Sequence, residues 1–210
     1  MAKVVVYGVT GFTGGNIARE LVSRGHEVTG VARNIADFAI DGVTVAAGDI
    51  NDLAGFAANI DGASDVILAL RHSEPKLAPL VPAIIEAAAR AGVRVGVIGG
   101  AGSLKISENG PRLIDTPEFP KEYLAEATDA VATLDALKAS ANGDWFYVSP
   151  AQWYGSYVPG ERLGAYRLGL EVLITDENGK SAIGGEDFAI AIVDEIETKT
   201  HRNQRFTLGY

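Results

Sequence analysis

The 210-residue sequence contains no cysteine, which excludes disulfide bonds and thiol catalysis. It also lacks any apolar run near the roughly 20 residues that a membrane-spanning helix needs. Acidic residues outnumber basic ones, giving a net charge of −9 that argues against binding to nucleic-acid phosphates. The first residues lead straight into an apolar segment, without the pattern of a signal peptide. We therefore expect a cytoplasmic protein without a membrane or nucleic-acid partner.

The sequence also lacks the spacings that metal sites and serine hydrolases require. Its three histidines, His26, His72 and His201, lie far apart and form no pattern such as His-x-x-x-His. We predict no metal site, and we interpret His26 and His201 as surface residues without a role. No Gly-x-Ser-x-Gly segment is present either, which argues against a serine-hydrolase nucleophile.

A short β-branched segment enters a glycine-rich turn near the amino end. Residues 3–7 read Lys-Val-Val-Val-Tyr, the turn reads Gly-Val-Thr-Gly-Phe-Thr-Gly-Gly, and residues 17–22 continue with helical spacing. In such a strand–turn–helix, a dinucleotide diphosphate approaches the glycines and faces the first amides of the helix. The pattern predicts a dinucleotide site, with a purely structural turn as the alternative. The candidate binding residues are Gly8, Thr10, Gly11, Phe12, Thr13 and Gly14.

Strand-like and helix-like segments alternate through the middle of the chain. Apolar runs predict strands at 27–33, 43–47, 65–70, 93–98 and 144–148. A helix ending at Gly92 is predicted to begin near residues 80–82, because Pro75 and Pro79 favour a loop before it. Another helix is predicted from an N-cap at Thr116-Pro117 to about residue 141. This alternation is typical of an α/β fold with a Rossmann-type doubly wound parallel sheet.

The alternation stops after Pro150. Residues 150–186 contain short apolar pieces separated by glycine and proline, and we predict that they form a small C-terminal cap on the substrate side. A plain sheet edge with turns is the alternative. A helix around residues 186–196 and a strand at 204–208 are predicted to follow. We expect a single NAD(P)-binding domain over residues 1–210.

The end of the second predicted strand bears on the choice of dinucleotide. Sites that bind NAD place an acidic residue there, where it accepts a hydrogen bond from the ribose 2′-hydroxyl. This chain has Arg33 followed by Asn34. A guanidinium can bind a 2′-phosphate through two parallel hydrogen bonds, so we expect NADP(H) to be preferred over NAD(H). A solvated surface arginine is the alternative.

Taken together, several motifs resemble those of a known family. They are the glycine turn, Arg33, Gly48-Asp49-Ile50, the run from Gly99 to Ser103, and Ser149-Pro150. The chain resembles atypical short-chain dehydrogenases/reductases over nearly its whole length, above all NAD(P)H-flavin reductases of the NmrA-like and biliverdin reductase B-like type. The resemblance implies that Asp49 and Ile50 lie by the adenine, although Asp49 could equally cap a helix. It also implies that Ala69, Leu70 and Arg71 line the ribose and diphosphate, and that Gly99 and Gly100 border the nicotinamide.

The catalytic residues depart from the larger superfamily, which pairs a serine with Tyr-x-x-x-Lys. Ser103 and Tyr123 are present, but Ala127 stands where the lysine would be. An unassisted phenol titrates near pH 10, so it is a poor proton donor for a ketone at neutral pH. Hydride transfer to an electron-poor flavin or quinone needs less acid catalysis. Ser103, Tyr123 and His72 are the candidate catalytic residues, each with a purely structural alternative.

Two functional hypotheses follow. The first is an NADPH-dependent reductase whose acceptor is FMN, FAD, riboflavin or a quinone-like molecule, with Trp153 and Tyr154 either stacking on its ring or packing in the core. The second is an NADP-binding redox sensor of the NmrA type that acts without turnover. An epimerase is disfavoured by the missing Tyr-x-x-x-Lys. The long helix before residue 141 could face solvent or a second copy, which leaves a homodimer open.

Overall fold

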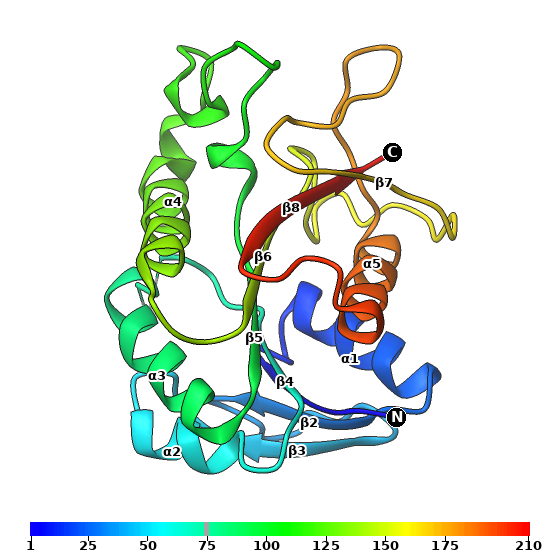
Figure 1. The fold of residues 1–210 in the computed structure, drawn as a ribbon. Coiled ribbons are helices and arrows are strands. Elements are labelled where there is room, and N and C mark those ends of the chain that lie inside the picture. The colour runs from blue at the N-terminus through cyan, green and yellow to red at the C-terminus, as the bar shows by residue number, and fades with distance from the viewer. Residues whose placement is uncertain (74–75) are drawn as a thin grey trace.

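Within residues 1–73 and 76–210, which the computed structural model describes, eight strands form one continuous sheet (Figure 1). The order β3-β2-β1-β4-β5-β6-β8-β7 contains the doubly wound arrangement 3-2-1-4-5-6. All neighbouring pairs are parallel except β7 and β8, which are antiparallel at one edge. The strands are β1 (Lys3–Tyr7), β2 (Glu27–Ala32), β3 (Val43–Ala47), β4 (Asp65–Leu68), β5 (Arg94–Ile98), β6 (Trp145–Ser149), β7 (Arg167–Gly169) and β8 (Gln204–Gly209). The predicted Rossmann-type α/β fold is confirmed.

Helices cover both faces of the sheet. One face carries α1 (Phe12–Ser23) and α5 (Gly185–Thr198), and the other carries α2 (Leu53–Asn59), α3 (Val81–Ala91) and α4 (Leu124–Ala139) (Figure 1). The alternation along β1 explains the two layers, because successive side chains of a strand point to opposite faces. Val4 and Val6 belong to the core under α1 and α5, whereas Val5 and Tyr7 belong to the other core.

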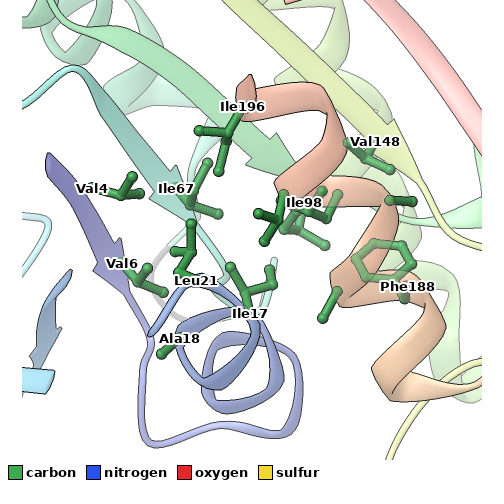
Figure 2. Packing of buried hydrophobic residues seen from close by; sticks show 14 of the residues in the cluster. Val4, Val6, Ile17, Ala18, Leu21, Ile67, Ile98, Val148, Phe188 and Ile196 are labelled. Atoms are coloured by element: carbon green, nitrogen blue, oxygen red, sulfur yellow. The ribbon is translucent and has the colours of Figure 1, made fainter. Parts of the chain in front are cut away.

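The core on the α1 side contains a large apolar cluster where the two helices meet the sheet. Ile17 and Leu21 of α1 and Phe188 of α5 are inaccessible to solvent and pack with Val4 and Val6 (Figure 2). Burying each such side chain contributes roughly 1.5–3 kcal/mol. This packing fixes the position of α1, whose amino end follows the glycine turn.

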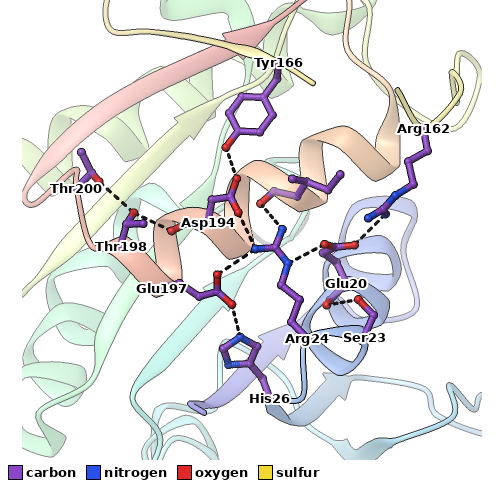
Figure 3. Close-up of polar contacts among 11 residues, drawn as sticks. Glu20, Ser23, Arg24, His26, Arg162, Tyr166, Asp194, Glu197, Thr198 and Thr200 are labelled. Carbon is purple, nitrogen blue, oxygen red and sulfur yellow. Dashed lines mark hydrogen bonds and ion pairs between the residues drawn. The ribbon is translucent and has the colours of Figure 1, made fainter. Parts of the chain in front are cut away.

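A polar network joins the exposed sides of the same two helices. Arg24, just after α1, donates hydrogen bonds to Glu20 of α1 (2.8 Å) and to Asp194 of α5 (2.6 Å) (Figure 3). Burial raises the pKa of Glu20, but hydrogen bonds from Arg162 and Arg24 outweigh it and hold the pKa below its usual value. The carboxylate therefore stays ionised between two guanidinium groups and links α1 to the segment before α5.

The two histidines predicted to be surface residues without a role, His26 and His201, both make structural contacts. The His26 ring is almost fully covered, accepts from the Ala2 amide (3.1 Å) and lies 2.9 Å from a Glu197 carboxylate oxygen (Figure 3). His201 is buried, pairs with Glu195 (2.7 Å) and stacks on Phe206. The surface prediction was wrong because Ala2 and Glu197 contact the His26 ring, while Glu195 of α5 and Phe206 of β8 contact the His201 ring.

Several element boundaries follow the predictions. The strand at 43–47 lies where it was expected, and the strands predicted at 27–33 and 93–98 are each one residue shorter (27–32 and 94–98). The last strand extends one residue further than predicted, to Gly209. Helix α3 begins at Val81, within the predicted start, and ends before Gly92, whose φ of 69° is the left-handed value that glycine adopts freely. Pro75 lies outside the described residues.

The long helix before β6 begins later than predicted. Thr116 is not its N-cap: the residue follows a short 3₁₀ turn (Leu113–Asp115), and its hydroxyl donates to the Leu113 carbonyl (2.8 Å). Pro120 is extended, with ψ of 128°, so α4 starts only at Leu124 after a second 3₁₀ turn. Two elements were not predicted, namely α2, which Asp52 caps through the Gly55 amide (3.0 Å), and the edge strand β7. No described helix is both long and apolar enough to cross a membrane.

Candidate functional site

The glycine turn connects β1 to α1 at the carboxyl edge of the sheet. Gly8 has φ of 83°, and its amide donates to the Val31 carbonyl of β2 (2.8 Å). A Cβ atom on Gly8 would lie 2.2 Å from the Ala69 carbonyl oxygen, so only glycine fits there. A Cβ atom on Gly14 would lie 2.3 Å from the Gly8 carbonyl oxygen. The turn is therefore folded tightly between the ends of β1, β2 and β4.

The amino end of α1 has the properties of an anion site. Its N-cap is Gly11, with no side-chain cap, and the first turn contains no acidic residue. The first amides of a helix carry partial positive charge and need acceptors. Thr10 and Gly11 are exposed, and Phe12 and Thr13 are half-buried. These features fit a diphosphate, which would bring both negative charge and acceptor oxygens.

Arg33 and Asp49 follow neighbouring strands. Arg33 is exposed at the end of β2, and Asp49 follows β3, where the Gly48 amide donates to the Ala32 carbonyl (3.0 Å). Hydrogen bonds from the amide and side chain of Asn51 (2.9 and 2.8 Å), aided by the charge of Arg33, hold the pKa of Asp49 below its usual value. Asp49 closes this turn and does not cap α2, which is the role of Asp52. Ile50 is buried in the core under α2.

The remaining predicted cofactor residues follow β4 and β5. Ala69 and Leu70 are half-buried beside Gly8, and Arg71 is exposed. Gly99 packs against Tyr147, because a Cβ atom there would lie only 1.8 Å from the tyrosine hydroxyl oxygen. Next to Gly99, Gly100 has room for a side chain. The structure thus brings these residues to one edge of the sheet, where ligands of doubly wound folds bind.

A cleft of about 480 Å³ begins at Gly99 and Gly100 and extends outward from them. Segments 113–130 and 152–157 line its sides, and in Figure 1 they rise from the same end of the sheet, before α4 and after β6. Its lining is rich in aromatic side chains, several of them solvent-exposed: Trp153 is 47% exposed, Tyr123 51% and Tyr157 62%. Exposed aromatic rings in a concave surface are typical of a site for a flat organic ligand.

Two of the three predicted catalytic residues line this cleft. Tyr123 projects from the 3₁₀ turn before α4. The His72 ring is buried, with Nε2 donating to the Ile98 carbonyl (3.0 Å) and Nδ1 3.4 Å from an Asp129 carboxylate oxygen. Because a carbonyl only accepts, this contact places a proton on Nε2. His72 is thereby fixed in the wall of the cleft next to Gly99.

Ser103 lies behind the cleft. Its hydroxyl accepts a hydrogen bond from Arg205 (2.9 Å), a buried residue of β8 that also donates to Ser149 (3.2 Å) and pairs with Glu171. The described cleft lining includes Gly102 but not Ser103. These contacts give Ser103 a structural partner, and its catalytic role stays a prediction.

The two aromatic residues after β6 occupy different environments. Trp153 lines the cleft, held by the bond from its amide to the Ser181 carbonyl (2.9 Å). Tyr154 is instead packed against Phe12 and Phe188, and its hydroxyl lies 2.8 Å from that of Thr13. Burial raises the pKa of Tyr154, in keeping with a neutral structural phenol. Of this pair, only Trp153 is placed to stack on a ligand in the cleft.

The NAD(P)H-binding family model matches residues 8–197. The chain belongs to this family. It is 34% identical to YwnB of Bacillus subtilis, over 98% of this chain and 97% of that protein. It is also similar to a Streptococcus pneumoniae protein provisionally described as an NADH-flavin reductase, with 34% identity, a TM-score of 0.86 and coverage of 100% and 99%. A Bacteroides thetaiotaomicron protein provisionally described as an epimerase has 35% identity, a TM-score of 0.89 and coverage of 100% and 97%.

These findings confirm that the chain belongs to an NAD(P)H-binding family and support an NAD(P)H-dependent oxidoreductase in general. Sequence reasoning missed most of the cleft. Leu113, Phe119 and Tyr157 carry no motif, and their approach depends on how two long loops fold. The three glutamates in the segment 118–126 were also missed, although their regular spacing of four residues was visible.

Proposed function

We propose that the protein binds NADPH along the carboxyl ends of β1, β4 and β5 and reduces a flat, electron-poor aromatic acceptor in the neighbouring cleft. The observation that carries the proposal is that the cleft adjoins the expected cofactor site. The aromatic cleft begins at Gly99 and Gly100, the residues expected to border the nicotinamide, and the glycine turn lies at the same edge of the sheet. A flavin or quinone held there would meet the reactive face of the cofactor.

The chain's own contribution is positioning and water exclusion. Bound NADPH would supply two electrons and a proton as hydride, and water would supply the second proton that the reduced acceptor takes up. Trp153, Tyr123 and Tyr157 would hold the ring of the acceptor by stacking, and His72 would form a fixed wall beside the reacting ends. The missing Tyr-x-x-x-Lys matters little for such an acceptor, because the negative charge that develops is delocalised over the ring.

The decisive experiment combines binding with turnover. Calorimetry should detect binding of NADPH, and loss of the nicotinamide absorbance band should follow when riboflavin, FMN or a benzoquinone is added. Tight binding without oxidation across this panel would favour the non-catalytic redox sensor. Failure to bind either pyridine nucleotide would overturn both functions.

The preference for NADPH is assigned to Arg33, which is exposed beside Asp49. We expect Arg33→Asp to raise the Kd of NADPH about 10- to 100-fold, since hydrogen bonds to a charged group contribute about 1.5–3 kcal/mol. The Kd of NADH should change less than about threefold, because NADH has no 2′-phosphate for the guanidinium to bind. Calorimetric titrations with both nucleotides measure the two constants.

Arg90→Asp is the matched control, since it makes the same change of charge on an exposed part of α3. It should leave both constants within about twofold of the native values. Equal weakening of NADPH and NADH by Arg33→Asp would refute the assigned role.

A further inference from the structure

Three carboxylates line the cleft. Glu118, Glu122 and Glu126 all line it; the first two are exposed and the third is half-buried. Within residues 1–73 and 76–210, no lysine or arginine lines the cleft. In the same part of the chain, none of the three carboxylates forms an ion pair with a basic side chain. The lining of the cleft therefore carries net negative charge.

The same cleft is built for an aromatic ring. Phe119 and Tyr123 come from the segment before α4, and Trp153 and Tyr157 come from the segment after β6. A volume of about 480 Å³ is within the range of pockets that bind drug-sized molecules. Aromatic faces attract cations, and nearby carboxylates strengthen this preference. The shape of the cleft thus favours a flat ring system, and its charge disfavours a ligand that carries negative charge.

We infer that the acceptor is a planar aromatic molecule without a phosphate or other anionic group, so that a neutral or cationic ring is bound in preference to a phosphorylated flavin. This inference rests on the proposed function, because it concerns the acceptor side of that site. A phosphate monoester carries a charge of about −1.5 to −2 at neutral pH. In FMN this charge sits at the end of a flexible chain, which would lie near the carboxylates when the ring is in the cleft.

Riboflavin and FMN provide a direct test, because they share the isoalloxazine ring and differ by the phosphate. Their dissociation constants can be measured by quenching of flavin fluorescence on the NADP⁺-saturated protein, where no turnover occurs. At low ionic strength, FMN should bind at least about five- to tenfold more weakly than riboflavin, as expected for repulsion at roughly 8–10 Å in water. The difference should shrink in about 1 M salt, where the Debye length falls to about 3 Å.

Removing the three carboxylate charges should remove the difference in affinity between FMN and riboflavin. The triple variant Glu118→Gln/Glu122→Gln/Glu126→Gln should bind FMN and riboflavin within about twofold of each other, with the affinity for riboflavin little changed. The control variant Glu27→Gln/Glu86→Gln/Glu177→Gln alters net charge equally at exposed positions outside the described cleft lining, and it should retain the native ratio.

The outcomes separate this inference from the proposed function. If riboflavin binds and is reduced by NADPH while FMN binds equally well to the native protein, the charge selection is wrong and the reductase stands. The inference would also be overturned if the triple glutamine variant of the cleft kept the same ratio of FMN to riboflavin dissociation constants as the native protein. If neither flavin binds and no acceptor of the panel is reduced, both the inference and the proposed reductase fail.

Discussion

Replacing Gly14 with alanine is expected to raise the Kd of NADPH at least about 100-fold. The new Cβ atom would lie 2.3 Å from the carbonyl oxygen and 2.7 Å from the carbonyl carbon of Gly8. Gly8 cannot retreat, because its amide is bonded to Val31 and its own Cα faces the Ala69 carbonyl. The turn has to open, which misaligns the amides that would hold the diphosphate; each charge-assisted bond contributes about 1.5–3 kcal/mol. Calorimetry with NADPH measures the loss.

Gly15→Ala is the matched control for this substitution. There the nearest atoms are the Val9 carbonyl oxygen and the flexible end of Arg19, both at 3.3 Å, so a small shift can accommodate the methyl group. The free energy of unfolding should stay within about 1 kcal/mol of the native value, since alanine is favoured over glycine inside a helix. Urea titrations of both variants distinguish a misfolded Gly14→Ala protein from a folded one that has lost its site. A folded variant with native affinity would exclude the turn as the diphosphate site.

The second large effect is expected at Arg94, where β5 begins. Its side chain is only 3% exposed, as is that of its partner Glu195 on α5. The guanidinium also donates to the carbonyls of His201 (2.9 Å) and Glu195 (3.1 Å), and it lies 4.5 Å above the ring of Phe146. Arg94→Met should lower the free energy of unfolding by about 3–5 kcal/mol, because it leaves a buried carboxylate and two carbonyls without this donor. Urea denaturation at neutral pH measures the change.

A matched substitution on the surface shows whether burial causes this effect. Arg90 pairs with Glu86 at 3.5 Å, but both side chains are about 70% exposed (72% and 69%). Arg90→Met should therefore change the free energy of unfolding by less than about 0.5 kcal/mol. An equally small loss of unfolding free energy in both variants would contradict this prediction. It would mean that His201, whose amide and ring both contact the Glu195 carboxylate, satisfies that carboxylate without Arg94.

Local sequence patterns predicted the β1–turn–α1 unit well. The β-branched run of β1, the glycine turn and the start of α1 are adjacent in sequence, and the glycines are required by backbone contacts within and beside that turn. The boundaries of β3 and the end of α3 at Gly92 follow from equally local rules. Such features depend on φ preferences and side-chain alternation, which neighbouring residues determine.

Two predictions failed although the deciding contacts lie close in sequence. His201 was taken for a surface residue, but Glu195 on α5 and Phe206 on β8, which flank it in the chain, contact its ring. The helix before β6 was started too early because Thr116-Pro117 is a good N-cap pattern, yet this threonine bonds back to Leu113. In the first case α5 and β8 place Glu195 and Phe206 against the ring, and in the second a local 3₁₀ turn occupies the threonine hydroxyl.

The amino-acid sequence by itself determined the alternating α/β order, the tight glycine turn and the absence of the Tyr-x-x-x-Lys pair. Each of these features depends on residues that lie close together in the chain. Only the tertiary structure decided which side chains line the cleft beside Gly99. The bond from Trp153 to Ser181 and the contact of Arg205 with Ser103, 102 residues away, shape the segments around the cleft. Such pairings depend on how the whole sheet and its loops assemble. They bring aromatic rings and carboxylates that belong to no sequence motif into one cleft.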